Sequence, residues 1–392
     1  MENIYLQKAK TLAPWLEETF KHLHRHPELA SQEFETQKFI IAELEKMGIE
    51  AAPCADTGVV GIIRGGKPGK TVAFRSDIDA LPIEEACDVP YKSQNPGVMH
   101  ACGHDTHMTI LLGFAKMMAE KKDELKGNIK LFFQPAEEAG GGAKRMIAEG
   151  CLENPKVDAV FFSHCTPTLD FGKINARMGS VSAASNGFTV TFTGKGCHGA
   201  YPQRGTDPIV CACQVVTALQ TIPSRRTAPS DPVVVTVGAI HAGTVGNIIP
   251  NTVEISGTIR TMNPDTRAKV LEEFRQIVTG ISSAMGVETD IRIKNGYAAT
   301  VNNDDMVELV RRSGAKVLGD ENVGKTGPTV MGAEDFSYFC EAVPGCYYRF
   351  GVGTPGGENI TVHNPRFQAD LRALPYGAAM YAQIAEDFLN GN

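Results

Sequence analysis

Continuously apolar strands alternate with amphipathic helices in the first part of this chain, and this alternation limits the folds that it can adopt. Predicted strands lie at 58–65 (GVVGIIRG), 71–79 (TVAFRSDID), 127–134 (GNIKLFFQ) and 157–164 (VDAVFFSH). A long amphipathic helix is predicted at 106–125 (THMTILLGFAKMMAEKKDEL). Strands without polar alternation are typical of a sheet that helices cover on both faces. We therefore expect an α/β fold in which helices flank a mixed sheet.

Two more helices are predicted near the N-terminus. Residues 10–26 place apolar side chains at helical spacing. In the segment 31–48, Ser31 is the predicted N-cap and Gly48 the predicted C-cap.

The pattern changes near Ser180, where the strands begin to alternate apolar and polar residues. Such strands have one face open to solvent. The order strand–helix–strand–strand–helix–strand is typical of a ferredoxin-like α+β layer. These elements are predicted at 185–196, 207–221, 232–243, 251–262, 265–286 and 288–296. We expect an inserted domain at 181–295, between the two parts of a discontinuous domain at 1–180 and 296–392.

Composition and charge exclude several classes of protein. The 392 residues carry a net charge of −7 and no polybasic block, which argues against nucleic acid or an anionic membrane as the main partner. The sequence has neither a run of about twenty apolar residues nor an apolar signal segment at its start, so we expect no membrane span and no secretion. Ten cysteines at irregular spacing predict free thiols in a reducing cytoplasm.

The decapeptide MHACGHDTHM, residues 99–108, concentrates groups that bind metals. It contains His100, Cys102, His104, Asp105 and His107. Thiolate, imidazole and carboxylate groups are the ligands of zinc-like ions. A solvated loop with a buried cysteine would explain the same residues. Because Cys102 and His104 cannot surround an ion alone, a metal site needs partners elsewhere in the chain.

Three later segments offer such partners. Glu137 and Glu138 follow a strand, and neighbouring side chains there point in different directions, so one carboxylate can bind a metal while the other takes a proton from a bound water. His164 ends an apolar strand, where α/β proteins place their sites, and His363 follows a short β-branched run. Each segment also has a simpler explanation. The glutamate pair could be a solvated acidic turn, His164 a buried core histidine, and His363 a histidine of a surface loop. Cys102, His104, Glu138, His164 and His363 exceed the four ligands of one tetrahedral ion, which indicates two ions.

Eight motifs, in order, resemble those of the metal-dependent aminoacylase/carboxypeptidase superfamily. The resemblance runs from about His24 to Phe367 and is strongest to the N-acyl-amino-acid amidohydrolases, a branch that includes hippurate hydrolases and plant enzymes that split auxin conjugates. The motifs are RHPEL, SDIDALPI, MHACGHDTH, QPAEE, GCHGAYP, GNIIPNTVEISGTIRT, MGAEDFSYF and VHNPRF.

The resemblance implies roles for particular residues. Glu137 would be the general base, and two divalent ions per subunit would be zinc, manganese, cobalt or nickel, since a thiolate ligand disfavours magnesium and calcium. The implied metal ligands are Cys102, His104, Glu138, His164 and His363.

The resemblance also implies roles outside the ligand set. His198 of the inserted domain, often supplied by the partner subunit, would hydrogen-bond the oxyanion. Asn247 and Arg260 would hold the substrate carboxylate, for which the planar guanidinium of arginine is suited. We expect three aspartates to orient ligand histidines, and one of them stands where related branches carry a metal-binding histidine. They are Asp77 (at the histidine position), Asp79 and Asp105.

The expected activity is hydrolysis of the amide bond of N-acyl amino acids (N-acetyl, N-benzoyl or similar). A dipeptidase or carboxypeptidase of the same superfamily is the alternative, and a non-catalytic metabolite-binding relative is disfavoured because Glu137 and the ligands are present. The resemblance further implies a homodimer, or a dimer of dimers, formed through an inserted domain that also acts as a lid. We expect residues 251–261 to form an exposed edge strand that pairs with its two-fold mate.

Overall fold

The computed structural model describes residues 2–327 and 330–391, which form two compact units. The first unit contains the chain up to Gly179, a segment that begins at Val301, and the chain from Asp335 onward. The second unit contains Ser180–Thr300 and a short segment that ends at Glu334. The chain passes between the units at β7 (Gly179–Ser182) and β14 (Thr300–Asn302).

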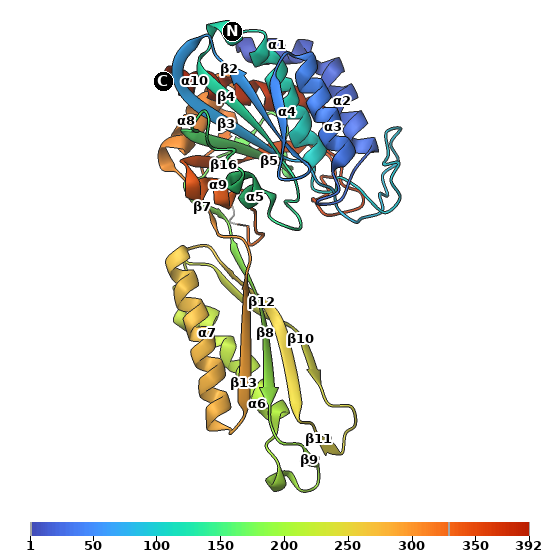
Figure 1. Ribbon diagram of the computed structural model, residues 1–392, viewed down its shortest axis with the longest axis vertical. Helices are drawn as coiled ribbons and strands as arrows, with labels where there is room; N and C mark the ends of the chain where they lie inside the picture. Colours follow the sequence, from blue (N-terminus) through green and yellow to red (C-terminus); the bar gives the residue numbers. More distant parts are fainter. Residues whose placement is uncertain (1, 328–329, 392) are drawn as a thin grey trace. The chain divides into compact units, whose positions relative to one another are not determined.

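A mixed sheet forms the centre of the first unit (Figure 1). Its middle strands β4, β3, β5 and β16 run parallel to one another, whereas β2 pairs antiparallel with both β1 and β4, and β6 pairs antiparallel with β16. The strands are, in sheet order, β1 (Glu50–Cys54), β2 (Gly58–Arg64), β4 (Lys126–Gln134), β3 (Lys67–Asp77), β5 (Ala159–Asp170), β16 (Gly345–Gly353), β6 (Ile174–Asn175) and β15 (Val323–Gly324). The predicted α/β class with a mixed sheet is confirmed.

Helices bury both faces of this sheet, and β4 shows how. Ile129, Leu131 and Phe133 belong to the main core, whereas Phe132 stacks on Phe339 of α9 on the opposite face. The helices are α1 (Ile4–Thr11), α2 (Ala13–Arg25), α3 (Phe34–Lys46), α4 (His104–Ala119), α5 (Gly142–Ala148), α8 (Asp304–Leu318), α9 (Ser337–Ala342) and α10 (Leu374–Asn390). Within the described residues, no helix is both long and apolar enough to cross a membrane.

Two helix predictions need correction. The helix expected at 10–26 is two helices, which break at Leu12, so that Pro14 falls in the first turn of α2, where its missing N–H does no harm. Ser31 does not cap α3, because it lies before the helix with a left-handed φ of 62° and Glu33 occupies the cap position.

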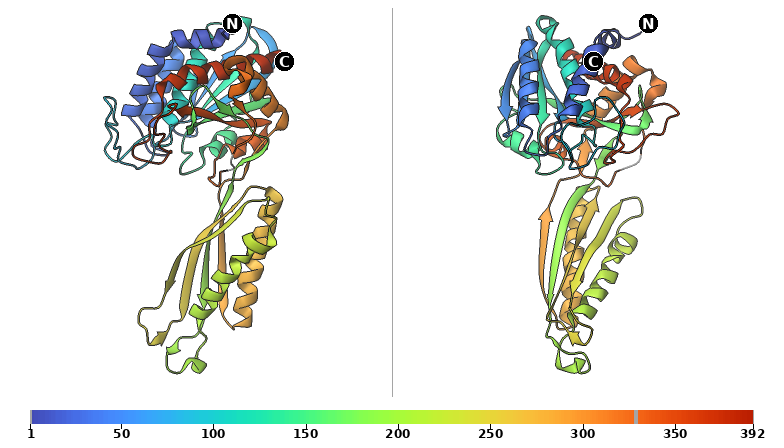
Figure 2. Two further views of the ribbon diagram at one scale, coloured as in Figure 1. Left: turned by 180° about the vertical axis from the view of Figure 1, so that it is seen from behind. Right: turned by 90° about the vertical axis from the view of Figure 1, so that its right-hand side faces the viewer.

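The second unit is a ferredoxin-like layer whose sheet has the order β10–β12–β8–β13. All neighbours are antiparallel, and α6 and α7 pack on one face over a separate apolar core (Figure 2). The expected edge strand at 251–261 is wrong: it forms β12, which pairs on both sides, and β10 and β13 are the edges. The elements are β8 (Ala184–Thr193), β9 (Cys197–His198), α6 (Pro208–Leu219), β10 (Val233–Ala242), β11 (Ile248–Ile249), β12 (Thr252–Thr261), α7 (Pro264–Ala284) and β13 (Glu288–Asn295).

Candidate active site

Acidic and imidazole groups lie at or near the carboxyl ends of neighbouring parallel strands of the first unit. Strand β3 ends at Asp77, and the turn that carries Glu137 and Glu138 follows the end of its parallel neighbour β4. His164 lies inside β5 rather than at its end, because that strand continues to Asp170 beside β16. The sequence prediction therefore placed His164 in the correct strand but misjudged where the strand ends.

A tight turn before α4 places Cys102 and His104 side by side. Gly103, between them, has a left-handed φ of 81°, and a Cβ there would lie 2.3 Å from Cys165 Sγ. Only glycine therefore fits this position without a shift of the chain. The helix begins at His104, so the imidazole stands on its first turn.

The predicted ligands converge within the first unit. Cys102 Sγ is 3.6 Å from His164 Nε2, and His363 Nε2 is 3.1 Å from Glu138 Oε1. Ligand atoms also lie within 4.8 Å of one another in two overlapping groups that share the thiol. These groups are Cys102–His104–His164 and Cys102–Glu138–His363. The sequence-distant His363 joins this cluster because its backbone N–H donates to Ala101 O at 2.7 Å.

Asp79 and Asp77 contact His104 of this cluster, and Asp77 also contacts the neighbouring His107. Asp79 accepts the Glu138 N–H at 2.9 Å through Oδ2, and its backbone oxygen contacts His104 Nδ1 at 2.8 Å. Asp77 Oδ1 contacts His107 Nδ1 at 2.6 Å, and its Oδ2 is 3.5 Å from His104 Nε2. Carboxylates in such positions fix the orientation of imidazole ligands.

The third predicted aspartate makes a different contact. Asp105 Oδ2 is 2.6 Å from Nδ1 of His24, a buried residue of α2. His24 Nε2 is in turn 3.2 Å from Glu85 Oε1. Asp105 thus links the first turn of α4 to α2 through His24.

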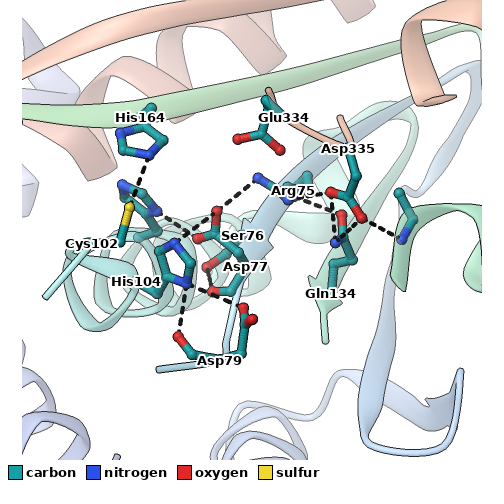
Figure 3. A network of polar contacts seen from close by, with 12 residues as sticks. Arg75, Ser76, Asp77, Asp79, Cys102, His104, Gln134, His164, Glu334 and Asp335 are labelled. Atoms are coloured by element: carbon teal, nitrogen blue, oxygen red, sulfur yellow. Dashed lines mark hydrogen bonds and ion pairs between the residues drawn. The ribbon is translucent and has the colours of Figure 1, made fainter. Parts of the chain in front are cut away.

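A buried arginine, Arg75, lies between Asp77 and Asp335 beside the cluster, and it was not among the predicted site residues (Figure 3). Arg75 donates from Nη1 to Asp77 at 2.8 Å, from Nη2 to Asp335 at 3.0 Å, and from Nε to Gln134 at 2.9 Å. Its guanidinium lies over the ring of Phe162 at 4.2 Å. A charged residue inside the apolar strand TVAFRSDID was the available signal.

Burial and nearby carboxylates shift the pKa values of two of these histidines in opposite directions. Burial lowers the pKa of His164 to about 3, which keeps its ring neutral and its lone pair available. Burial alone also lowers the pKa of His104, but the carboxylates of Asp77 and Asp79 outweigh it and raise the pKa to about 10. Burial raises the pKa of the Cys102 thiol well above its usual range, and the Glu138 carboxylate adds to this effect.

The donor set fits a soft or borderline divalent cation. His104 Nε2 is buried, yet it makes no hydrogen bond to any described residue. A cation bound between these groups would satisfy that nitrogen and stabilise the thiolate of Cys102. Thiolate, imidazole and carboxylate ligands together suit zinc-like ions rather than calcium or magnesium.

The second unit holds the other predicted residues, and they do not all lie together. His198 in β9 is exposed and pairs with Ile248 of β11, next to Asn247, whose backbone oxygen accepts from Gly199 N at 2.8 Å. Arg260 instead lies half-buried in β12, where burial lowers its pKa and Nε donates to Thr258 Oγ1 at 3.2 Å.

Comparisons with known proteins agree with this architecture and donor set. Residues 73–387 match the model of Peptidase family M20/M25/M40, and the chain belongs to this family. It is a hydrolase of amide bonds, of the metal-dependent aminoacylase/carboxypeptidase type that the motifs indicated.

Three relatives illustrate the range of the family. Thermostable carboxypeptidase 2 of Saccharolobus solfataricus is 40% identical over 97% of both chains. The N-acetyl-L-cysteine deacetylase of Bacillus subtilis is 40% identical over 95% of this chain and 88% of its own. A Bacillus subtilis crystal structure described as a dinuclear metal-binding peptidase from the M20 family superposes with a TM-score of 0.86 at 32% identity, covering 97% of this chain and 99% of the other.

Proposed function

We propose that this protein hydrolyses the amide bond of N-acyl amino acids with a metal-activated water. The observation that carries the proposal is the convergence of thiol, imidazole and carboxylate ligands beside Glu137 at the edge of the sheet. Ligand atoms of His104, Glu137 and Glu138 lie within 4.8 Å of one another, so a base stands next to the ligands. The deacetylase relative supports the acyl substrate class.

Two divalent ions would be held by the five converging ligands, with Cys102 common to both groups. Zinc, manganese, cobalt and nickel all suit this donor set. When bound, the ions would lower the pKa of a water and polarise the amide carbonyl. The dinuclear Bacillus subtilis structure supports the number of ions.

The protein's own residues would then move the proton and hold the substrate. Glu137 takes a proton from the attacking water and passes it to the leaving amine. His198 hydrogen-bonds the oxyanion, while Asn247 and Arg260 hold the carboxylate of the amino acid. The half-buried setting of Arg260 supports this role, because a partly desolvated guanidinium pairs more strongly with a carboxylate.

A dipeptidase or carboxypeptidase activity is the second candidate, and the 40% identical carboxypeptidase favours it. Both activities share the hydrolytic chemistry and differ in the group beyond the carbonyl. An acyl group and an aminoacyl group are therefore distinguished by substrate assay rather than by the ligand set.

We further propose a cytoplasmic homodimer or dimer of dimers. The ten cysteines, which all lie within the described residues, are not joined in disulfides, which suits a reducing compartment. The strand β10 is an edge of its sheet and exposes Ile240 at 50%, so it offers a surface for a second copy.

The test is a release assay on the metal-loaded enzyme and its Glu137→Gln variant. Free amine is measured from N-acetyl, N-benzoyl and long-chain N-acyl amino acids and from dipeptides, with and without chelator. We expect chelator-sensitive release from N-acyl substrates and a loss of about 100-fold or more in kcat for the variant at unchanged metal content. Release from dipeptides alone would favour the second candidate, and wild-type turnover by the variant would refute Glu137 as the base.

A further inference from the structure

The turn that carries Glu137 and Glu138 lacks the backbone pairing that holds the preceding strand. Strand β4 ends at Gln134, and Pro135 has no N–H to donate. The next amides bond to side chains from distant segments instead. Ala136 N–H donates to Glu33 Oε1 at 2.9 Å, and Glu138 N–H donates to Asp79 Oδ2 at 2.9 Å. Two buried carboxylates therefore hold the backbone on both sides of Glu137.

The backbone of this turn adopts an unfavourable conformation. Ala136 has a φ of 53°, in the left-handed region that costs a residue with a Cβ about 1–2 kcal/mol. Its carbonyl accepts from Gly141 N at 3.0 Å, and the chain then passes so close to Pro135 that a Cβ on Gly142 would lie 1.7 Å from Pro135 O. Such a conformation persists only where surrounding contacts impose it. The bond from Ala136 to Glu33 is one of these contacts.

Glu33 is itself rigidly held. Its side chain is fully buried, and Oε2 accepts from Thr57 Oγ1 at 2.6 Å in the segment between β1 and β2. Glu33 occupies the N-cap position of α3 but makes no capping bond from its side chain. Helix α3 therefore lacks a capping bond from Glu33, which would be favourable, and a carboxylate is buried at a cost in free energy. In this position the carboxylate accepts the hydrogen bond of the Ala136 N–H.

We infer that Glu33 is a positioning residue for the general base and acts through the Ala136 amide. This inference rests on the proposed role of Glu137. The candidate ligand in this turn, Glu138, keeps its own backbone bond to Asp79 when Glu33 is replaced, so we expect the variant to retain its metal. A displacement of about 1 Å in a catalytic group lowers turnover by up to about 100-fold. We therefore expect Glu33→Ala to lower kcat by roughly 10- to 100-fold, with KM changed less than about twofold.

A conservative variant separates positioning from charge. In Glu33→Gln the amide oxygen can still accept from Ala136, and the amide nitrogen can donate to the Thr57 hydroxyl. Burial, with a smaller contribution from Asp79, raises the pKa of Glu33, so a neutral group is tolerated there. We expect this variant to restore kcat to within about threefold of wild type.

Two further variants complete the set. Glu33→Asp keeps the carboxylate but shortens its reach by one methylene, so it should lose kcat as Glu33→Ala does. Thr57→Val is the matched control, because it removes the other hydrogen bond of Glu33 while leaving the bond to Ala136. We expect Thr57→Val to keep kcat within about threefold of wild type, even if its unfolding temperature falls.

The experiment measures kcat and KM of full-length, metal-loaded protein, with metal content and folded fraction determined for each variant. Wild-type kcat per folded enzyme in Glu33→Asp or Glu33→Ala would overturn the inference and leave Glu33 a structural residue. Equal losses in Thr57→Val and Glu33→Asp would also overturn it. Wild-type turnover in Glu137→Gln would instead refute the proposed function, independently of Glu33.

Discussion

His24 carries a positive charge that ties three segments of the first unit together. Burial by itself lowers its pKa, but the hydrogen bonds to Asp105 and Glu85 outweigh burial and raise the pKa from 6.5 to about 9. A group whose pKa rises on folding stabilises the protein fully below its unfolded pKa and loses this effect as pH rises through the folded value. The stabilisation, on the order of 3 kcal/mol, should therefore disappear between about pH 6.5 and 9.

This prediction is tested by comparing urea unfolding of wild type and His24→Gln at several pH values. The stability difference between the two proteins should be large at pH 6 and small at pH 9.5. Taking the difference cancels the titration of the groups that His24 does not contact. An equal difference at both pH values would mean that His24 is not charged in the folded protein.

Cys102 is predicted to bind metal directly. Loss of a group that merely orients a ligand typically lowers affinity 10- to 100-fold, so loss of the ligand itself should cost at least about tenfold. We expect Cys102→Ser to lose metal on dialysis under conditions in which the wild type retains it, as measured by elemental analysis. Cys87→Ser is the matched control, because Cys87 is equally buried, at 7% exposure, and its thiol lies against Phe367 O. Equal metal retention by both variants would contradict the ligand role.

Residue chemistry reveals ligands more readily than it reveals the residues that support them. Cys102 and His104 stand out because thiol and imidazole groups cluster in a short segment. Arg75 is visible in the sequence only as a charged residue inside an apolar strand, and Glu33 gives no signal of its own. Each has a partner far along the chain: Arg75 donates to Asp335, and Glu33 accepts from Ala136. A single sequence contains no signal that pairs residues so far apart.

At the scale of elements, the junction before α4 depends on Gly103. Alanine there would combine backbone strain at φ 81° with a Cβ 2.3 Å from Cys165 Sγ. We expect Gly103→Ala to lower the unfolding temperature and the metal content together, because Cys102 and His104 flank the substitution. Gly97→Ala is the matched control: its φ is 74°, but its Cβ would meet nothing within 4 Å.

The control isolates the cost of strain, about 1–2 kcal/mol, from the effect of the clash. Calorimetry and elemental analysis on both variants measure the two quantities. If Gly97→Ala and Gly103→Ala behave alike, the clash is relieved by a shift of Cys165 and the junction is more adaptable than its geometry indicates.

Element types were easier to predict than their ends and neighbours. Apolar patterning identifies β5, but it does not show that the strand continues past His164, because residues 165–170 gain their strand partner from β16. Alternation identifies β12 as a strand, yet nothing in its pattern reveals that it pairs with both β10 and β8. Strand partners from elsewhere in the chain decide both features.

At the scale of the whole molecule, the order of strands in the sheet could not be predicted from local sequence patterns either. The mixed α/β class follows from buried apolar strands between helices. The position of β16 beside β5 does not, since residues 171–344 lie between them, including the whole second unit. The candidate site depends on this return of the chain, because His363 comes from the segment after β16.

Metal removal should affect the two units differently. Each unit has its own apolar core, and all five proposed ligands belong to the first. A ligand present at 100 times its Kd stabilises the folded state by about 2.7 kcal/mol. For a unit of this size, that corresponds to roughly 5–10 °C in unfolding temperature. Chelation should therefore lower one calorimetric transition by this amount and leave the other in place.

Differential scanning calorimetry of the metal-loaded and the chelated protein checks this expectation. Return of the shifted transition after addition of zinc or manganese is the control for irreversible damage. A Cys102→Ser sample should show the lower transition even before chelation, since it retains less metal. If the protein instead shows a single transition that chelation shifts as a whole, the units unfold as one cooperative body, and the binding energy of the ions stabilises the whole chain rather than the unit that holds them.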